Sequence, residues 1–233
     1  MGLLPSGVDV RGVLYVYLAF AFVPMMTVFH HRTLRAKHGD FRGAMLYFAA
    51  FFALFLAVPL AIILAGAARP GDVLASFGVA AGHAGTGLLL TAIGVPLALA
   101  AGFIGSRDPA LREQYPFSKG ACSGTRRFAL YEGAYLALYY VPWEFLFRGV
   151  LFLPLVPLVG LVPALAVQTI ASTLYHFGHP ASEIISAAAA GFVFGLISYA
   201  TGSIFYTVVL HATVGIATDT FICVRRRRTV AGS

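Results

Sequence analysis

Two charged side chains stand four residues apart in a stretch that is otherwise apolar and aromatic, YYVPWEFLFRGVLFL at residues 139–153. At this spacing Glu144 and Arg148 share one face of a helix and can form an ion pair. A buried glutamate can act as a general base, but such a pair can also simply neutralise its own charges. The pair alone therefore leaves a catalytic and a structural role open.

Histidines occur in the two apolar regions that follow. His176 and His179 lie three residues apart in TLYHFGHP, and Pro180 is expected to end that helix. His211, in FYTVVLHATVGIATD, is the one basic residue of the last apolar run. A histidine at a helix end can cap carbonyl groups, and a lone membrane histidine often makes an interhelical hydrogen bond. Each histidine taken singly is therefore ambiguous.

The combination of these residues indicates hydrolysis. Short loops should make the three segments neighbours, which brings one carboxylate close to two or three imidazoles. Glu144 would then activate water, while imidazoles would donate to the developing oxyanion. Glu144, His179 and His211 could instead bind zinc with one position left for water. We favour a mechanism without a metal or other cofactor.

Of the nine acidic residues, few others fall inside apolar segments. Glu132 does, and Asp219 does too, close to the basic tail, where it is expected to compensate local charge. Glu183 is assigned to a loop or the edge of a segment. We expect none of these three in the catalytic set.

Composition places the chain in a membrane. Of its 233 residues, 59% are hydrophobic and only 11% are charged, whereas soluble domains carry about 25% charged residues. The mean hydropathy is +0.85. Apolar runs long enough to cross a bilayer lie near 12–29, 43–66, 80–104, 127–156, 160–178, 182–200 and 203–224.

The predicted fold is an all-α, polytopic transmembrane helical bundle with seven or eight spans. We treat 1–233 as a single integral membrane domain, with the active site between helices of the C-terminal half. The 127–156 run is too long for one straight helix, so we expect a bend or split at Pro142, or an interfacial lead-in. A G-x-x-x-G pair, Gly191 and Gly195, is expected to serve close helix packing.

Lys and Arg gather in three segments, residues 30–42, 106–127 and 224–228. The positive-inside rule makes these segments cytoplasmic, which places the N-terminus outside and the C-terminus in the cytoplasm. The basic residues are expected to contact anionic lipids at the cytoplasmic face rather than nucleic acid. Cys122 and Cys223 both fall near that face, so a structural disulfide is not expected.

The order and context of the three polar segments resemble those of the CPBP family, the CAAX-protease and bacteriocin-processing intramembrane proteases. The resemblance covers residues 127–224. That family's motifs are Glu-Glu-xxx-Arg-Gly, Phe-xxx-His and His-xxx-Asn. They map onto Trp143-Glu144-Phe-Leu-Phe-Arg148-Gly149, onto Tyr175-His-Phe-Gly-His179, and onto His211-Ala-Thr-Val-Gly215.

The resemblance implies roles for the matched residues. Glu144 would be the base, Arg148 its orienting partner, and His179 and His211 the groups that position water or stabilise the oxyanion. Three positions depart from the family pattern: Trp143 replaces the first glutamate, Tyr175 replaces phenylalanine, and Gly215 replaces asparagine. His176 and Thr213 are candidates for the role of the missing asparagine.

The sequence therefore predicts an intramembrane endopeptidase that hydrolyses a peptide bond in a membrane-associated or membrane-presented protein or peptide. C-terminal processing or removal of a sorting signal is one form this could take. The departures at Trp143 and Gly215 support an alternative, a non-catalytic membrane scaffold or regulator with the same fold. A proton-coupled transporter ranks last, because no inverted repeat is visible.

Overall fold

The computed structural model describes residues 9–65 and 67–231, and every regular element in these ranges is a helix. The predicted all-α membrane bundle is confirmed. The first elements are α1 (Val10–Met26), α2 (His31–His38), α3 (Asp40–Phe52), a π-helical segment (Ala53–Ala57), α4 (Val58–Ala65), α5 (Pro70–Ser76) and α6 (Ala84–Gly105). There follow α7 (Pro109–Gln114), a 3₁₀ turn (Lys119–Ser123), α8 (Thr125–Tyr135), a second π-helical segment (Leu136–Tyr140), α9 (Val141–Glu144), a third π-helical segment (Phe145–Val150), α10 (Val156–Val159), α11 (Leu161–Leu174), α12 (Ala181–Thr201) and α13 (Phe205–Ala231).

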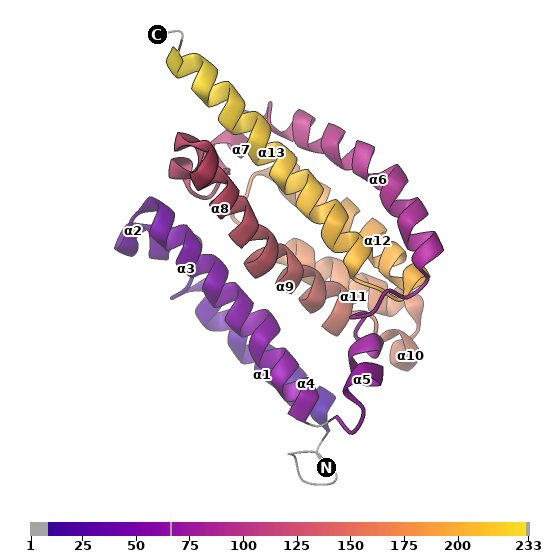
Figure 1. Cartoon of the computed structure of the whole chain (residues 1–233). Coiled ribbons are helices and arrows are strands. Elements are labelled where there is room, and N and C mark those ends of the chain that lie inside the picture. Colours follow the sequence, from indigo (N-terminus) through magenta and orange to yellow (C-terminus); the bar gives the residue numbers. More distant parts are fainter. Residues whose placement is uncertain (1–8, 66, 232–233) are drawn as a thin grey trace.

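The continuous helical run of residues 125–150, which we call the central run, lies in the middle of the bundle. Figure 1 shows α1, α3 and α4 on one side of it and α6, α11, α12 and α13 on the other. The helix α13 packs along α6, and α11 packs against α12. The segment that carries Glu144 therefore meets both halves of the chain.

Fewer helices qualify as membrane spans than the seven predicted. Among the residues that the structure describes, four helices are long and apolar enough: Asp40–Ala65, Ala84–Gly105, Ala181–Thr201 and Phe205–Arg227. The bent pair Val10–Met26 and His31–His38, with 46° between its helices, would make a fifth. The predicted 160–178 span is shortened to α11, of 14 residues, and residues 125–150 carry charged side chains that lower their hydropathy. Both remain part of the bundle, although neither passes as a span.

A split of the helix at Pro142, one of the predicted alternatives, does not occur, since residues 125–150 form one unbroken helical run. Two π-helical segments flank the four-residue α9, which begins one residue before the proline. Proline has no backbone N–H to give to the preceding turn, and a π-type widening is one way for a helix to continue past it. The run therefore carries Trp143 and Glu144 into the buried centre of the bundle.

The packing of α11 on α12 uses the two small residues predicted for it. A Cβ atom at Gly195 would lie 2.4 Å from Leu165 Cδ1, and one at Gly191 would lie 3.1 Å from Ser172 Oγ. Gln168 is fully buried at this contact and donates from Nε2 to the Gly191 carbonyl at 2.8 Å. The close approach confirms the predicted packing role of the G-x-x-x-G pair and fixes the turn that carries His176 and His179.

The three basic segments meet at one end of the bundle. Arg32 donates to the carbonyl of Gly178 at 3.3 Å, and Asp40 accepts from Ser118 Oγ at 2.6 Å. Arg227 Nε donates to the Cys122 carbonyl at 3.0 Å. We call this end the basic end. The grouping agrees with the sequence-based assignment of the three segments to one side, while the direction in which that side faces stays a prediction.

The expectation that the two cysteines would remain unpaired is wrong. Cys122 and Cys223 form a disulfide, with Cα atoms 5.0 Å apart. The 3₁₀ turn of residues 119–123 lies against α13, so the two sulfur atoms meet although 101 residues separate them in sequence. The expectation rested on placing both cysteines near the cytoplasmic face, where disulfides are rare.

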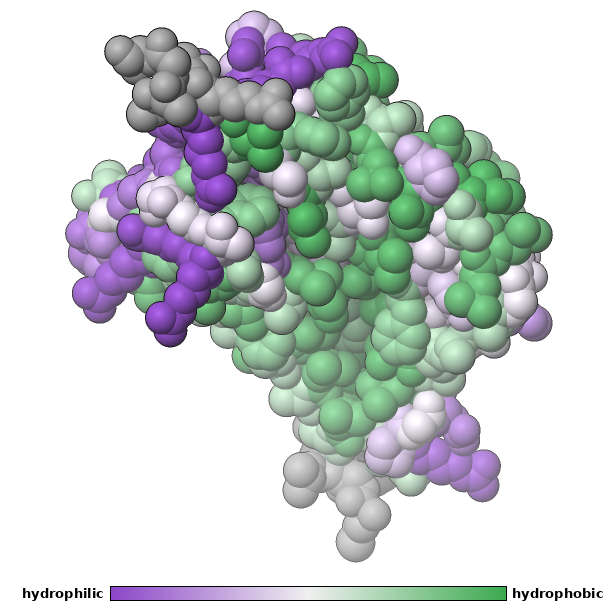
Figure 2. Space-filling model, turned by 45° about the horizontal axis from the view of Figure 1, so that its top comes forward, coloured by the Kyte–Doolittle hydropathy of each residue, from purple (hydrophilic) through white to green (hydrophobic). Residues whose placement is uncertain are grey.

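A broad apolar surface lies between the polar ends. Figure 2 shows hydrophobic side chains covering much of the visible face, with hydrophilic residues gathered at its ends. Large exposed apolar side chains include Leu88 and Leu97 of α6, Val162 of α11, and Ile185 of α12, all more than half exposed. Such a surface is expected where helices contact lipid, which supports an integral membrane protein.

Candidate active site

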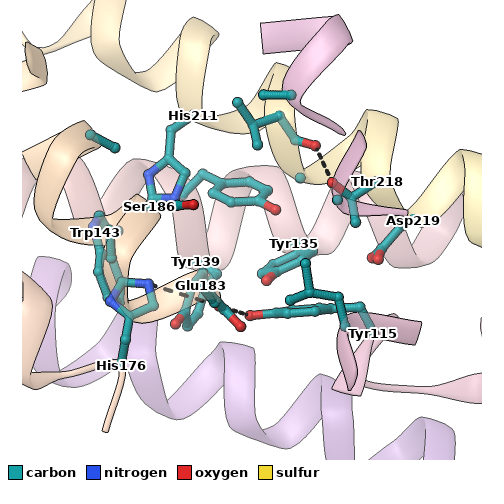
Figure 3. Close-up of a pocket in the computed structure, with 18 of the residues that line it drawn as sticks. Tyr115, Tyr135, Tyr139, Trp143, His176, Glu183, Ser186, His211, Thr218 and Asp219 are labelled. Atoms are coloured by element: carbon teal, nitrogen blue, oxygen red, sulfur yellow. Dashed lines mark hydrogen bonds and ion pairs between the residues drawn. The ribbon is translucent and has the colours of Figure 1, made fainter. Parts of the chain in front are cut away.

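A cavity of about 210 Å³ opens between the central run, α6, α12 and α13. Figure 3 shows polar and aromatic side chains of the central run, α12 and α13 around it, whereas α6 contributes Ala101 and Gly105. The polar and aromatic lining residues are Tyr115, Tyr135, Tyr139, Tyr140, Trp143, His176, Glu183, Ser186, Phe194, His211, Thr218 and Asp219. We call this cavity the central pocket. It runs from His211 and Trp143 toward the basic end.

Glu144, Arg148 and His211 come together at the inner end of the pocket. Glu144 Oε1 lies 2.7 Å from His211 Nδ1, and Glu144 Oε2 lies 3.2 Å from Arg148 Nε. Glu144 is fully buried and Arg148 is 2% exposed. Burying either charge alone would be strongly unfavourable, so each stabilises the other.

Of these three side chains, only His211 lines the pocket. A carboxylate can only accept, so the short contact makes Nδ1 of His211 the donor to Glu144. Nε2 is then the ring nitrogen that can contact a molecule bound in the pocket. In the neutral imidazole with Nδ1 protonated, Nε2 carries a lone pair. This is the arrangement in which a carboxylate orients a histidine base.

A second polar group lies across the pocket and includes a residue that the sequence reasoning did not select. The Glu183 Oε1 atom lies 2.9 Å from His179 Nδ1 and 4.0 Å from His176 Nε2, and it accepts a hydrogen bond from the Tyr115 hydroxyl. Figure 3 shows Glu183 joined to His176 and Tyr115. Burial, followed by the neighbouring Glu183, raises the pKa of Tyr115 well above its usual value, so the phenol stays protonated and donates.

His179 is held by this second group rather than by Glu144. It lies beside a separate hollow at the basic end, lined also by His31, Arg32 and Arg35, and is not among the residues that line the central pocket. His176 does line the pocket, and its Nδ1 lies 2.8 Å from the Ser172 carbonyl. His176, and not His179, therefore shares the central pocket with His211. His179 contacts Glu183 instead.

The indole ring of Trp143 packs between His176 and His211. Its ring centroid lies 5.0 Å from that of His176 and 5.8 Å from that of His211. Tyr175 packs edge-on against the same indole at 5.2 Å, within the aromatic core. Thr213 is placed elsewhere, with its hydroxyl donating to the Val209 carbonyl at 2.7 Å. Trp143 thus lines the pocket, Tyr175 packs against Trp143 without lining it, and Thr213 does not line it.

Tyr140 fills the space beside Gly215, the position at which the CPBP pattern has asparagine. A Cβ atom on Gly215 would lie 1.6 Å from the Tyr140 hydroxyl oxygen. The Tyr140 ring also packs on the imidazole of His211, with centroids 4.9 Å apart. A phenol that comes from the central run therefore occupies the place of the missing side chain.

Gly215→Ala should destabilise the protein, by about 1–3 kcal/mol as for other overpacked cores, because the new methyl group must displace Tyr140. Gly133→Ala is the matched control: it lies inside α8, and a Cβ atom there would meet nothing within 4 Å. Thermal unfolding in detergent should show a lower midpoint for Gly215→Ala and an unchanged or higher one for Gly133→Ala. Equal midpoints for the two variants would show that Tyr140 does not occupy this space.

The residues proposed as zinc ligands do not form a metal-binding set. Within residues 9–65 and 67–231, no group of three or more His, Cys, Asp or Glu side chains is arranged to hold a metal ion. Glu144 and His211 are in contact, but His179 is engaged with Glu183. The chemistry that this site supports is that of paired carboxylates, imidazoles and phenols.

The spacing of Glu183 from the two histidines is a sequence signal for its place in the site. Glu183 lies four residues after His179 and seven after His176, the spacing of one helix face, but Pro180 suggested that the helix ended there. In the structure α12 begins at Ala181, so Glu183 sits in its first turn and turns back toward the histidines. Tyr115 and Tyr140 carried no comparable signal.

The comparison with protein families adds a match over the same segment. Residues 132–217 match the family model described as "Type II CAAX prenyl endopeptidase Rce1-like". This confirms the resemblance to CAAX-type proteases, and the match contains Glu144, Arg148, His176, His179 and His211. The Rce1-like segment supports protease chemistry at the level of the family. No curated protein and no solved structure significantly matches the chain.

Proposed function

We propose that this chain is an intramembrane endopeptidase that hydrolyses a peptide bond in a membrane-associated or membrane-presented protein or peptide. The observation that carries the proposal is the 2.7 Å contact between the fully buried Glu144 carboxylate and His211, whose ring lines the central pocket. The Rce1-like match over residues 132–217 supports the same class of reaction.

In this proposal the glutamate acts on water through histidine. Glu144 accepts from Nδ1 of His211 and leaves the Nε2 lone pair directed to the pocket. Nε2 takes a proton from water as the water oxygen attacks the carbonyl carbon of the substrate, and the carbonyl π electrons move to its oxygen. The carboxylate of Glu144 stabilises the resulting imidazolium without taking its proton.

The tetrahedral intermediate then collapses. The C–N bond breaks, and the proton on His211 Nε2 passes to the leaving nitrogen, which gives a carboxylic acid and an amine. The ring of Tyr140 packs on His211, and its hydroxyl, which lies beside Gly215, is a candidate donor to the oxyanion. His176 faces the same space over Trp143, and its Nε2 can accept the second hydrogen of the attacking water.

The remaining predicted residues act as positioning residues. Arg148 fixes Glu144, and His179 fixes Glu183. No step requires a metal ion or another cofactor. The substrate is presented within or at the membrane, and the basic end is proposed to contact anionic lipid headgroups at the cytoplasmic face, with the C-terminus on that side.

Co-expression with candidate membrane substrates tests the proposed function. The wild-type chain should release a cleavage product that Glu144→Gln, at matched expression, does not release. Equal processing by both would remove Glu144 from the mechanism. If the wild-type chain cleaves no member of a broad membrane reporter panel, the scaffold alternative replaces the proposal.

A further inference from the structure

The charge of the central pocket is opposite to the charge of the chain. The whole sequence carries 16 Lys and Arg against 9 Asp and Glu, a formal net charge of +7. Among the described residues that line the pocket, however, Glu183 and Asp219 are acidic and none is Lys or Arg. A group that enters the pocket therefore meets carboxylates rather than the cations that surround the basic end.

Glu183 is held as an acceptor with one oxygen still available. Two donors, the Tyr115 hydroxyl and His179, converge on Oε1. The other oxygen, Oε2, is buried and has no hydrogen-bond partner in the part of the chain that the structure describes. A buried carboxylate oxygen without a partner is costly, and a donor from a bound molecule would remove that cost.

Asp219 is a second acidic residue farther along the same pocket. Its side chain is 1% exposed, and no N–H or hydroxyl group of the described residues donates to either of its oxygens. Glu132, 7% exposed, lies directly beside it, close enough for the two carboxyl groups to share one proton in a hydrogen bond. Two neighbouring buried carboxylates resist ionising together, and a nearby positive charge relieves that repulsion.

The neighbouring lysine is not placed to neutralise these carboxylates directly. Lys119 donates from Nζ to the carbonyl oxygens of Arg112 and Tyr115, at 3.1 and 2.6 Å. Burial lowers the pKa of Lys119 to about 8, although the negative charge of Asp219 acts in the opposite direction. The acceptors of the pocket therefore remain open to a cation from outside the chain.

The walls between the two carboxylates suit a long basic side chain. Figure 3 shows Tyr115 and Tyr135 between Glu183 and Asp219, and Ala187 and Ala190 line the same pocket. Lys and Arg side chains bury an apolar stem along such walls and keep the charged head on acceptors, and phenol faces attract cations.

We propose that the central pocket is a subsite for a basic side chain, lysine or arginine, of the substrate. The subsite deepens the proposed function and rests on it, because it names the substrate class of the same site. It places a cationic residue of the peptide between Glu183 and Asp219 while the scissile bond lies at His211. Charge complementarity of this kind selects among substrates by penalising those with a neutral or acidic residue at that position.

A binding experiment tests the subsite without depending on cleavage. The full chain, purified in detergent, is titrated with hexylammonium and with the neutral hexan-1-ol, and thermal unfolding is followed. Hexylammonium should raise the midpoint more than hexan-1-ol does. Glu183→Gln keeps acceptors for Tyr115 and His179 and should weaken hexylammonium binding at least about 10-fold, as expected for a lost charge-assisted hydrogen bond.

Asp219→Asn is the second variant, in case Glu183→Gln folds poorly, and it should also weaken hexylammonium binding. Glu113→Gln, an exposed carboxylate on α7 outside the central pocket, is the matched control and should bind as the wild type does. Equal stabilisation by the amine and the alcohol, or unchanged amine binding in both pocket variants, would overturn the subsite.

The outcome separates the subsite from the proposed function. A chain that cleaves a reporter but shows no amine preference would refute the subsite and leave the protease intact. A chain that binds the amine through Glu183 but cleaves nothing would refute the protease. If both hold, a Lys→Gln change in a cleaved reporter should lower kcat/KM at least about 10-fold for the wild type, and much less for Glu183→Gln.

Discussion

His211→Gln should lower the rate of peptide cleavage by about 10²–10⁴-fold, the usual contribution of a general base. Glutamine can still donate a hydrogen bond to Glu144 but cannot take a proton from water. The measurement is single-turnover cleavage of a membrane reporter by the purified variant in liposomes. Because His211 touches the reacting water, the loss should fall on the chemical step with substrate binding little changed.

His83→Gln provides the matched control. His83 is exposed at the other end of the bundle, where its backbone N–H donates to the Thr201 carbonyl at 2.7 Å, and that bond survives the substitution. Its cleavage rate should equal that of the wild type. Cleavage by His211→Gln at a rate within a few-fold of the wild type would remove His211 from the proton transfer.

The second large effect concerns stability. Arg148→Met should destabilise the protein by about 3–5 kcal/mol, the usual cost of leaving one partner of a buried ion pair uncompensated. The guanidinium of Arg148 is 2% exposed and lies 3.2 Å from Glu144. Denaturant unfolding in detergent is the measurement, with the midpoint read by an intrinsic fluorescence signal.

The double variant Glu144→Gln with Arg148→Met distinguishes a charge effect from a packing effect. Removing both charges should restore most of the stability lost in Arg148→Met, because replacing a buried pair as a unit costs little. It should nevertheless remain inactive, since His211 has lost its carboxylate. If the double variant is no more stable than Arg148→Met, the loss comes from packing rather than from the uncompensated charge of Glu144.

The contact between the polar segments could be predicted from sequence because short connections force successive helices together. Glu144, Arg148 and His211 meet as that reasoning requires, and the family match covers all three. The packing of α11 on α12 through Gly191 and Gly195 followed from the same local rules.

Other features depend on information that local patterns do not contain. Pro142 was expected to interrupt a helix, but π-type widening on both sides carries the helix through. The approach of residue 122 to residue 223, which permits the disulfide, results from packing between distant segments. Charge alone suggested that Asp219 compensates the basic tail, whereas its side chain lines the central pocket.

The departures from the family pattern acquire physical meaning only in three dimensions. Trp143 provides an aromatic floor between His176 and His211, and Tyr140 fills the space beside Gly215. Glu183, from a different helix, supplies a carboxylate on the opposite wall of the pocket. Trp143, Tyr140 and Glu183 thus give this site its own set of chemical groups. The pocket is still lined by imidazoles and acidic side chains.

The most direct test of the central claim is cleavage of a single-span reporter peptide by the purified wild-type chain and by Glu144→Gln, both reconstituted in liposomes and both shown to be folded. The account predicts product from the wild type, identified by mass as the result of adding one water across a peptide bond, and at least about 10²-fold less from Glu144→Gln. Product formation at the same rate by both proteins would contradict it.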